Sequence, residues 1–192
     1  MAEDTRARIL AACAAVIAHS GLTRFRMSEV AREAGVSIGL LAYHFGDRDG
    51  LLQAALDEVT ASATRRAELV PETRTPATRL AALLCSEFGE EREIRAGSTV
   101  WNEVRAAAVF DAGRAAAVAR STGAWEADVA GLVAAAAPQL DAAAAALTLT
   151  ALIEGLSGRW LTGQLSAAQA QAAVRGALAG LGLGPESSAV PS

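Results

Sequence analysis

The sequence has few of the residues that stabilise β-rich, disulfide-linked or metal-binding proteins. Only 4% of its 192 residues are aromatic, and it contains two cysteines and two histidines. No segment alternates apolar and polar residues with the two-residue period of a β-strand. Alanine, the residue with the highest helix propensity, is abundant instead, and 52% of the residues are hydrophobic. We therefore expect an all-α fold with a packed core.

Motifs for metal binding and catalysis are also missing. Zinc sites usually contain close pairs of cysteine or histidine, whereas Cys13, His19, His44 and Cys85 are widely separated. We expect both thiols to be buried and free. The sequence contains neither a Gly-rich phosphate loop with its lysine nor a Gly-x-Ser-x-Gly nucleophile motif. We therefore expect no metal, no cofactor and no enzymatic activity.

Lysine is absent, so all 17 basic residues are arginine, and the net charge of −4 gives no overall support for nucleic-acid binding. Between Asp4 and Arg48, however, six arginines outnumber four acidic residues. The local net charge of +2 is compatible with phosphate contact. No apolar run is suited to spanning a membrane, and no signal peptide is visible. We expect a cytoplasmic protein.

The stretch Met27–Leu52 contains two short helical patterns joined by a tight turn. The first pattern places apolar residues at helical spacing, at Met27, Val30, Ala31 and Ala34. Gly35 can end this helix in a left-handed conformation, and Ser37 can cap the next one. A helix, a glycine-containing turn and a second helix form a helix-turn-helix motif, whose second helix enters the major groove of DNA.

The second helix of this motif is expected to run over Ser37–Phe45. Leu41 and Phe45 are four residues apart, so both should pack inward, and Phe25 should anchor the core beneath them. The remaining residues of this helix are left to face outward or to flank the edge. For Tyr43 and His44, packing at a helix end is the alternative to DNA contact.

Apolar residues at helical spacing predict seven further helices, over residues 5–19, 48–69, 77–91, 93–109, 111–136, 139–162 and 166–181. Pro71 and Pro76 enclose a break in this pattern. We therefore expect a three-helix DNA-binding domain over 1–47, a connecting helix over 48–69 and a larger ligand-binding and dimerisation domain over 70–182. Residues 183–192 form a Gly/Pro/Ser tail that we expect to be disordered.

The segment Gly35-Val-Ser-Ile-Gly-Leu-Leu-Ala-Tyr-His-Phe-Gly-Asp-Arg-Asp-Gly-Leu-Leu52 closely resembles the TetR family of bacterial transcriptional regulators. Few other helix-turn-helix families combine Gly-Val-Ser and Tyr-His-Phe at this spacing. The resemblance covers about the first 60 residues, and the segment from Ala151 to Trp160 is similar to the C-terminal region of BetI-like members. This resemblance implies about nine helices, a homodimer and a ligand cavity in the second domain.

The family pattern makes Ser37–His44 the recognition helix, with Gly39 allowing close approach to DNA. Tyr43 and His44 would bond phosphate oxygens, and Arg48 would meet the DNA backbone. The DNA-binding residues predicted in this way are Arg26, Ser28, Ser37, Ile38, Gly39, Leu40, Tyr43, His44 and Arg48.

Four positions depart from the family pattern. Ile38, Leu40 and Ala42 replace a usual lysine, threonine and tyrosine, and Arg26 stands where a capping threonine is common. The recognition surface is therefore unusually apolar. Such residues can contact thymine methyl groups, but they remove hydrogen bonds to base edges. We expect Arg24, Arg26 and Ser28 to supply compensating contacts.

Aromatic and charged residues on the later helices indicate an effector site, although ordinary core packing is the alternative for Phe88, Trp101, Phe110, Trp125 and Trp160. A buried Glu154 would need a partner, either Arg105 or a cationic ligand. Aromatic rings beside a carboxylate can hold a quaternary ammonium or a polyamine. The predicted ligand-binding residues are Phe88, Trp101, Asn102, Arg105, Trp125, Asp128 and Glu154.

The sequence thus predicts a dimeric repressor that binds a palindromic double-stranded DNA operator and is released by a small-molecule effector. The last two helices, which are rich in alanine and glycine, are expected to form the homodimer by covering the apolar stripe Leu149–Trp160. The alternative is a small-molecule-binding helical dimer without specific DNA binding, which the acidic net charge and the apolar recognition helix support. An enzyme is a third possibility that no motif supports.

Overall fold

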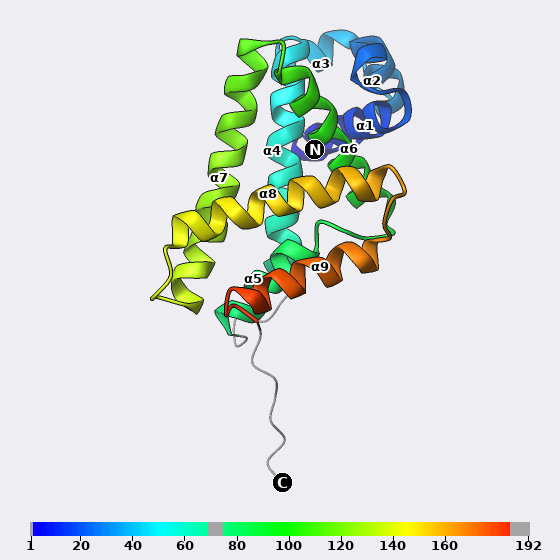
Figure 1. Cartoon of the computed structure of the whole chain (residues 1–192). Coiled ribbons are helices and arrows are strands. Elements are labelled where there is room, and N and C mark those ends of the chain that lie inside the picture. Colours follow the sequence, from blue (N-terminus) through cyan, green and yellow to red (C-terminus); the bar gives the residue numbers. More distant parts are fainter. Residues whose placement is uncertain (1, 69–74, 185–192) are drawn as a thin grey trace. The chain divides into compact units, whose positions relative to one another are not determined.

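The protein is built from helices joined by short connections (Figure 1). The computed structural model describes residues 2–68 and 75–184, and within these ranges it contains nine α-helices, one 3-10 helix and no strand. The elements are α1 (Ala2–Ser20), η1 (Leu22–Arg24), α2 (Met27–Ala34), α3 (Ile38–Phe45), α4 (Arg48–Glu68), α5 (Pro76–Cys85), α6 (Arg92–Ala108), α7 (Ala112–Ala136), α8 (Ala142–Leu161) and α9 (Ala167–Gly180). The predicted all-α fold with about nine helices is confirmed.

The helix-turn-helix forms where the sequence predicts it. Gly35 ends α2 with φ 64° and ψ 39°, and its N–H donates to the carbonyl groups of Ala31 and Arg32. Ser37 then caps α3, because its hydroxyl accepts from the backbone N–H of Leu40 at 3.1 Å. Local residue choices therefore fix the short turn between α2 and α3.

The C-terminal end of α5 and the N-terminal end of α8 differ from the sequence prediction. Helix α5 ends at Cys85 instead of residue 91, because Gln171 of α9 donates its side-chain amide to the carbonyl groups of Cys85 (3.3 Å) and Phe88 (2.7 Å). Helix α8 begins at Ala142 instead of residue 139, because the Asp141 carboxylate accepts from the N–H of Ala144 at 3.1 Å. In both cases a side chain satisfies backbone groups that a helix end leaves free.

The chain packs as two compact units. The first contains residues up to Ser62 together with Glu90–Thr122, and the second contains Ala63–Gly89 together with the described residues from Gly123 onward. This packing groups α6 with the N-terminal helices, although the two are far apart in sequence. The expected boundary at residues 70–74 lies outside the described residues, so the division of the chain by sequence stays a prediction.

The C-terminal tail begins later than predicted. Leu183, which we expected to be disordered, is buried, and its N–H donates to the carbonyl of Leu178 at 2.8 Å. Gly182 makes the required turn with φ 71°. Residues 185–192 lie outside the described part of the chain.

The core of the first unit lies between α1, α2, α3, α4 and α6. Phe25 and Leu41 are fully buried in it, as predicted, and Phe45 packs against it while remaining partly exposed. Cys13 is also buried there as a free thiol, and burial raises its pKa to about 12. Because Leu41 is anchored in this core, the opposite face of α3 must point outward.

The second unit buries the stripe Leu149–Trp160 of α8, so the prediction that a single chain exposes this stripe is wrong. Leu149 is 1% exposed and Trp160 is 4% exposed. The ring of Phe88 meets Trp160 edge-on, with a centroid separation of 5.8 Å, and α9 packs along both α5 and α8. The periodicity identified an apolar face correctly, but this face is covered by the chain itself.

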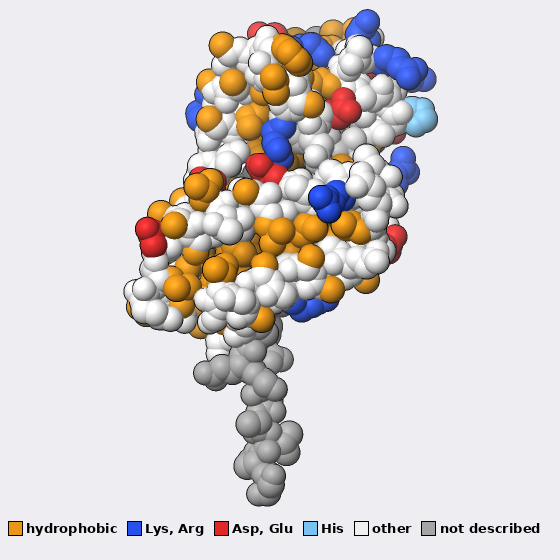
Figure 2. Space-filling view, in the orientation of Figure 1, with side chains coloured by type: hydrophobic (Ala, Val, Ile, Leu, Met, Phe, Trp, Pro, Cys, Tyr) orange, Lys and Arg blue, Asp and Glu red, His pale blue; other side chains and the backbone are white. Residues whose placement is uncertain are grey.

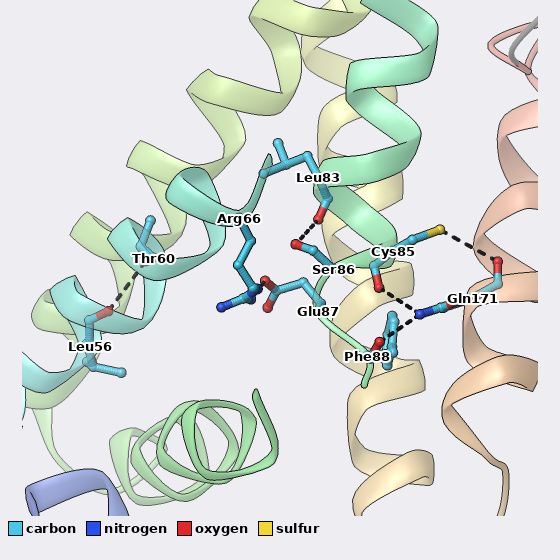
Figure 3. Close-up of polar contacts among 9 residues, drawn as sticks. All are labelled: Leu56, Thr60, Arg66, Leu83, Cys85, Ser86, Glu87, Phe88 and Gln171. Atoms are coloured by element: carbon cyan, nitrogen blue, oxygen red, sulfur yellow. Dashed lines mark hydrogen bonds and ion pairs between the residues drawn. The ribbon is translucent and has the colours of Figure 1, made fainter. Parts of the chain in front are cut away.

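An ion pair joins Arg66, in the last turn of α4, to Glu87, two residues beyond the end of α5 (Figure 3). The Nη2 atom of Arg66 lies 3.0 Å from Oε1 of Glu87, and both side chains are largely buried. Burial raises the pKa of Glu87 from 4.5 to about 7, and the charge and hydrogen bond of Arg66 only partly offset this effect. The folded chain therefore holds the Glu87 proton to a higher pH than the unfolded chain does.

We predict that Glu87 makes the folded state less stable as pH rises from about 4.5 to 7. Over this window the carboxyl group of Glu87 loses its proton in the unfolded chain but keeps it in the folded chain. The stabilisation of the folded state by Glu87 at low pH is therefore lost, up to about 3 kcal/mol. Urea unfolding across this range should show that Glu87→Gln reduces the pH dependence. Arg66→Met should instead steepen it, and equal slopes in all three proteins would contradict the assignment.

Candidate nucleic-acid interface

The outward face of α3 is apolar and exposed. Ile38 is 54% exposed, Leu40 38% and Tyr43 83%, while Leu41, which faces the core, is fully buried. The helix reads Ile-Gly-Leu-Leu-Ala-Tyr-His-Phe and contains no Arg, Lys, Asn, Gln, Asp or Glu. Its exposed surface therefore offers two polar side chains, Tyr43 and His44, beyond the capping Ser37.

Tyr43 and His44 lie side by side at the C-terminal end of α3. Their rings meet edge-on at 5.4 Å, and His44 also lies 6.0 Å from the ring of Phe45. His44 is half-buried by these contacts, whereas Tyr43 projects into solvent. Packing at the helix end, the alternative to DNA contact, therefore accounts for part of the His44 side chain but not for Tyr43.

The fold needs glycine at position 50 but not at position 39. A Cβ at Gly39 would meet only the Ser37 hydroxyl, at 3.9 Å, so the fold of the chain does not need glycine there. A Cβ at Gly50 would overlap the carbonyl oxygen of Phe45. The N–H of Gly50 donates to the Asp47 carboxylate at 2.9 Å, as expected for a helix cap. Gly50 thus allows α4 to start directly against the end of α3.

The predicted residues at the start of α2 are also exposed. Arg26 occupies the N-cap position with extended backbone and, as its sequence suggests, provides no side-chain cap. Its Nη1 atom donates to the neighbouring carbonyl of Phe25 at 3.0 Å. Arg24 and Ser28 are exposed nearby in sequence. These three residues supply positive charge and a hydroxyl group beside the uncapped N-terminus of α2.

Arg48, whose contact with DNA stays a prediction, has two partners within the protein. Its Nη2 atom donates to the carbonyl of Leu22 at 3.1 Å, and its guanidinium lies 5.6 Å from the centroid of the Phe25 ring. The N–H of Leu22 is held from another helix, because Glu103 of α6 accepts from it at 2.8 Å. We call this arrangement of Leu22, Arg48 and Glu103 the Leu22 clamp. It holds η1, the turn that leads directly into α2.

Sequence reasoning missed this function of Glu103. Gly21, with φ 72°, stands at the N-cap of η1 and has no side chain to cap it. The acceptor for Leu22 comes from 81 residues further along the chain. Gly21 indicated a turn, but nothing in the sequence identified the distant Glu103 carboxylate that accepts from the N–H of Leu22.

The predicted effector residues of α6 belong to the first unit. Trp101 packs against the core of that unit. The side-chain amide of Asn102 donates to the carbonyl of Ser98 within the same helix, at 2.8 Å. Arg105 is half-buried. Phe110, just after this helix, is 91% exposed, so its prediction as a core or cage residue is wrong.

The other predicted effector residues belong to the second unit. Phe88 and Trp125 are buried, and Phe88 contacts Trp160 as described above. Glu154 is half-buried on α8, whereas Asp128 is exposed on α7. The structure thus provides a buried aromatic pair and one partly buried carboxylate on α8 within one compact unit. Their role in ligand binding stays a prediction.

The described residues contain no group of three or more His, Cys, Asp or Glu side chains arranged to hold a metal ion. None of their helices has the length and apolar character needed to cross a membrane.

Comparison with known proteins identifies both parts of the chain. Residues 9–55 match the model of the bacterial regulatory proteins of the tetR family, and residues 76–183 match that of the BetI-type transcriptional repressor C-terminal domain. The chain belongs to the TetR family. It is a helix-turn-helix transcriptional regulator with a BetI-type C-terminal domain, as the sequence resemblance predicted.

Relatives cover most of this TetR-family regulator. It is 30% identical over 170 residues to the HTH-type transcriptional regulator BetI of Burkholderia ambifaria, covering 86% of this chain and 85% of that protein. A crystal structure assigned to a TetR-family regulator from Rhodococcus sp. superposes with a TM-score of 0.87 and 36% identity, over 96% of this chain and all of the other. A regulator from Saccharomonospora viridis, crystallised with choline, shares the fold with a TM-score of 0.73 and 24% identity, over 92% and 96% of the two chains.

We predict that the Leu22 clamp stabilises the DNA-binding unit of this TetR-family regulator. Glu103→Ala removes the acceptor of a partly buried N–H and should lower the free energy of unfolding by about 1–3 kcal/mol. Glu103→Gln keeps an acceptor oxygen and should cost less. Urea denaturation of the two variants measures the difference. The exposed Glu90→Ala serves as a control, and an equal loss in Glu90→Ala and Glu103→Ala would contradict the prediction.

Proposed function

We propose that this TetR-family regulator is a cytoplasmic, dimeric repressor that binds a palindromic DNA operator and releases it when a small molecule binds. The observation that supports DNA binding best is the placement of α3. Its inner face is anchored by Leu41, and Ile38, Leu40 and Tyr43 project from its outer face. A helix held in this way in a helix-turn-helix can enter the major groove without unfolding its support.

The residues of this interface have separate roles in the proposal. Ile38, Gly39 and Leu40 face base edges, and the absence of a side chain at Gly39 lets the helix approach them closely. Tyr43 and His44 contact phosphate oxygens at one end of α3. Ser28 and Ser37, with Arg26, do the same around the N-termini of α2 and α3. Arg48 supports this interface from within the protein, because its guanidinium holds Leu22 and Phe25 in place.

Dimerisation through α8 and α9 is supported by the surface that these helices expose. Hydrophobic side chains gather over them in Figure 2. Small residues and one leucine recur at helical spacing on this surface of α8, at Ala144, Leu147, Ala151 and Gly155. Exposed Ala172, Gly176 and Gly180 continue the pattern on α9. Small residues let helices approach closely, and two-fold pairing into a four-helix bundle would cover both stripes.

A cationic effector is supported by the composition of the second unit. Phe88 and Trp160 form a buried aromatic pair, and Glu154 precedes Trp160 on the same helix with its side chain partly buried. Aromatic faces and a carboxylate both attract a quaternary ammonium group. The choline bound by the Saccharomonospora viridis regulator makes choline the natural first probe.

We predict salt-sensitive binding to a specific DNA duplex with two chains per duplex. A duplex selected from a random library, together with the promoter of the protein's own gene, provides the probes for gel shifts and light scattering. Tyr43→Phe removes one hydroxyl and should weaken binding about fivefold, or ~1 kcal/mol, without changing the midpoint of urea unfolding. Absence of any shift at low salt would favour the alternative, a helical dimer without specific DNA binding.

Isothermal titration should detect choline binding that depends on Glu154. Glu154→Gln removes the charge that attracts the cation and should weaken binding by tenfold or more, ~1.4 kcal/mol. The exposed Glu90→Gln is the matched control, since it removes the same charge at a solvated position outside the predicted ligand-binding residues. No heat with choline, betaine aldehyde or polyamines would exclude a cationic effector of this kind and leave the DNA-binding proposal untouched.

A further inference from the structure

The recognition helix lacks every side chain that usually reads a base pair through paired hydrogen bonds. Arginine and lysine recognise guanine, asparagine and glutamine recognise adenine, and acidic residues accept from cytosine. None of these residue types occurs in α3, and the preceding turn contributes only Gly35, Val36 and Ser37. We propose that α3 reads its operator through pyrimidine 5-methyl groups, those of thymine or 5-methylcytosine. The inference rests on the proposed function, in which α3 enters the major groove.

The orientation of α3 supports this proposal. Leu41 is fully buried, which fixes the rotation of the helix, and Ile38 and Leu40 then stand exposed by 54% and 38%. Ala42 is exposed one turn after Ile38. Ile38 and Ala42 share one flank of the exposed side of α3 and Leu40 lies on the other flank, and all three side chains are exposed in the described part of the chain.

The polar groups nearby are poorly suited to reading bases. The Ser37 hydroxyl already accepts from the N–H of Leu40, so only its single hydrogen is left to donate. The ring of His44 is half-buried between Tyr43 and Phe45. Tyr43 lies at the far end of the helix, a full turn beyond Leu40. The central part of the helix is therefore purely apolar.

The major groove offers few partners to such a surface. Its floor is lined by hydrogen-bond donors and acceptors, and the methyl group on C5 of a pyrimidine is the apolar group that projects from it. Placing Ile38 or Leu40 against a cytosine amino group would leave that group without a hydrogen-bond partner. Placing either residue against a methyl group removes apolar surface of both molecules from water.

The size of the effect distinguishes this mode of recognition. Burying one methyl group corresponds to about a fourfold change in affinity, whereas a paired hydrogen bond to one base pair contributes between fivefold and more than a hundredfold. We therefore expect an operator in which several thymines each have a modest effect. Phosphate contacts should supply most of the affinity, with a correspondingly steep dependence on salt.

The test removes single methyl groups from the DNA. A duplex is selected with the full-length protein, and each thymine of one half-site is replaced in turn by deoxyuridine, which lacks only the methyl group. At one or more positions this change should weaken binding about fourfold in the wild-type chain. The same change should have no effect in Ile38→Ala or in Leu40→Ala, whichever residue contacts that methyl. Ile38→Val, which keeps most of the apolar surface, should retain part of the effect.

Several controls separate the possible outcomes. Ile38 and Leu40 are exposed, so unchanged urea unfolding of their alanine variants should show that the fold is intact. Deoxyuridine outside the half-sites should change nothing. At each sensitive position, the thymine–adenine pair is also replaced by a cytosine–guanine pair with and without a 5-methyl group on the cytosine. Tighter binding of the methylated duplex shows that the protein recognises the methyl group on cytosine as well as on thymine. Equal binding of the two duplexes restricts recognition to the methyl group of thymine. Insensitivity to every deoxyuridine, or equal sensitivity in the alanine variants, overturns the inference while DNA binding stands. Failure to select any duplex overturns DNA binding as well.

Discussion

The position of the DNA-binding motif depends on how the backbone of Leu22 is satisfied. A buried peptide group needs partners for both its N–H and its carbonyl. The N–H of Leu22 donates to the Glu103 side chain, and its carbonyl accepts from the Arg48 side chain as well as from the backbone N–H of Phe25. The two side chains come from α6 and α4, neither of which belongs to the motif itself. The turn before α2 is therefore held from outside, and a shift of either helix must carry Leu22 along or break a hydrogen bond.

This constraint gives a physical meaning to α4 as a connecting element. The helix runs from Arg48 to Glu68, its first part packs in the first compact unit, and its last residues belong to the second. Arg48 at one end contacts Leu22, and Arg66 near the other end contacts Glu87. One continuous helix thus has a charged contact in each unit. An element whose position both sites can influence provides a physical basis for coupling between them.

The fold was predictable from sequence wherever the deciding signal is local. Gly35 and Ser37 end and begin their helices through contacts with residues three or four positions away. The end of α5 was not predictable, because it depends on Gln171, 83 residues beyond Phe88. Gly50 was likewise overlooked, since its importance lies in the carbonyl of Phe45 that a side chain would overlap.

The same limit applies to the candidate sites. Apolar periodicity identified α3 and its outward face, and it identified the stripe Leu149–Trp160, but it could not show which of the two is covered. Leu41 gives α3 its rotation, whereas the α8 stripe is covered by the second unit. Arg48 shows the same limit, because its guanidinium donates to the carbonyl of Leu22, a contact within the protein that its position in the sequence does not indicate. Residue type and spacing indicate which interactions a side chain can make. The direction in which that side chain points depends on packing against residues far away in the sequence.

The identity of Arg48 also affects how the Leu22 clamp can be controlled. A guanidinium keeps its charge at any pH at which a protein stays folded, and it has no amine that acetylation could neutralise. Because lysine is absent from the whole chain, no side chain near the motif is open to that modification. Covalent acylation and ordinary changes in acidity therefore leave the guanidinium of the clamp unaltered. Breaking the Arg48 contact therefore requires a movement of Arg48 relative to Leu22.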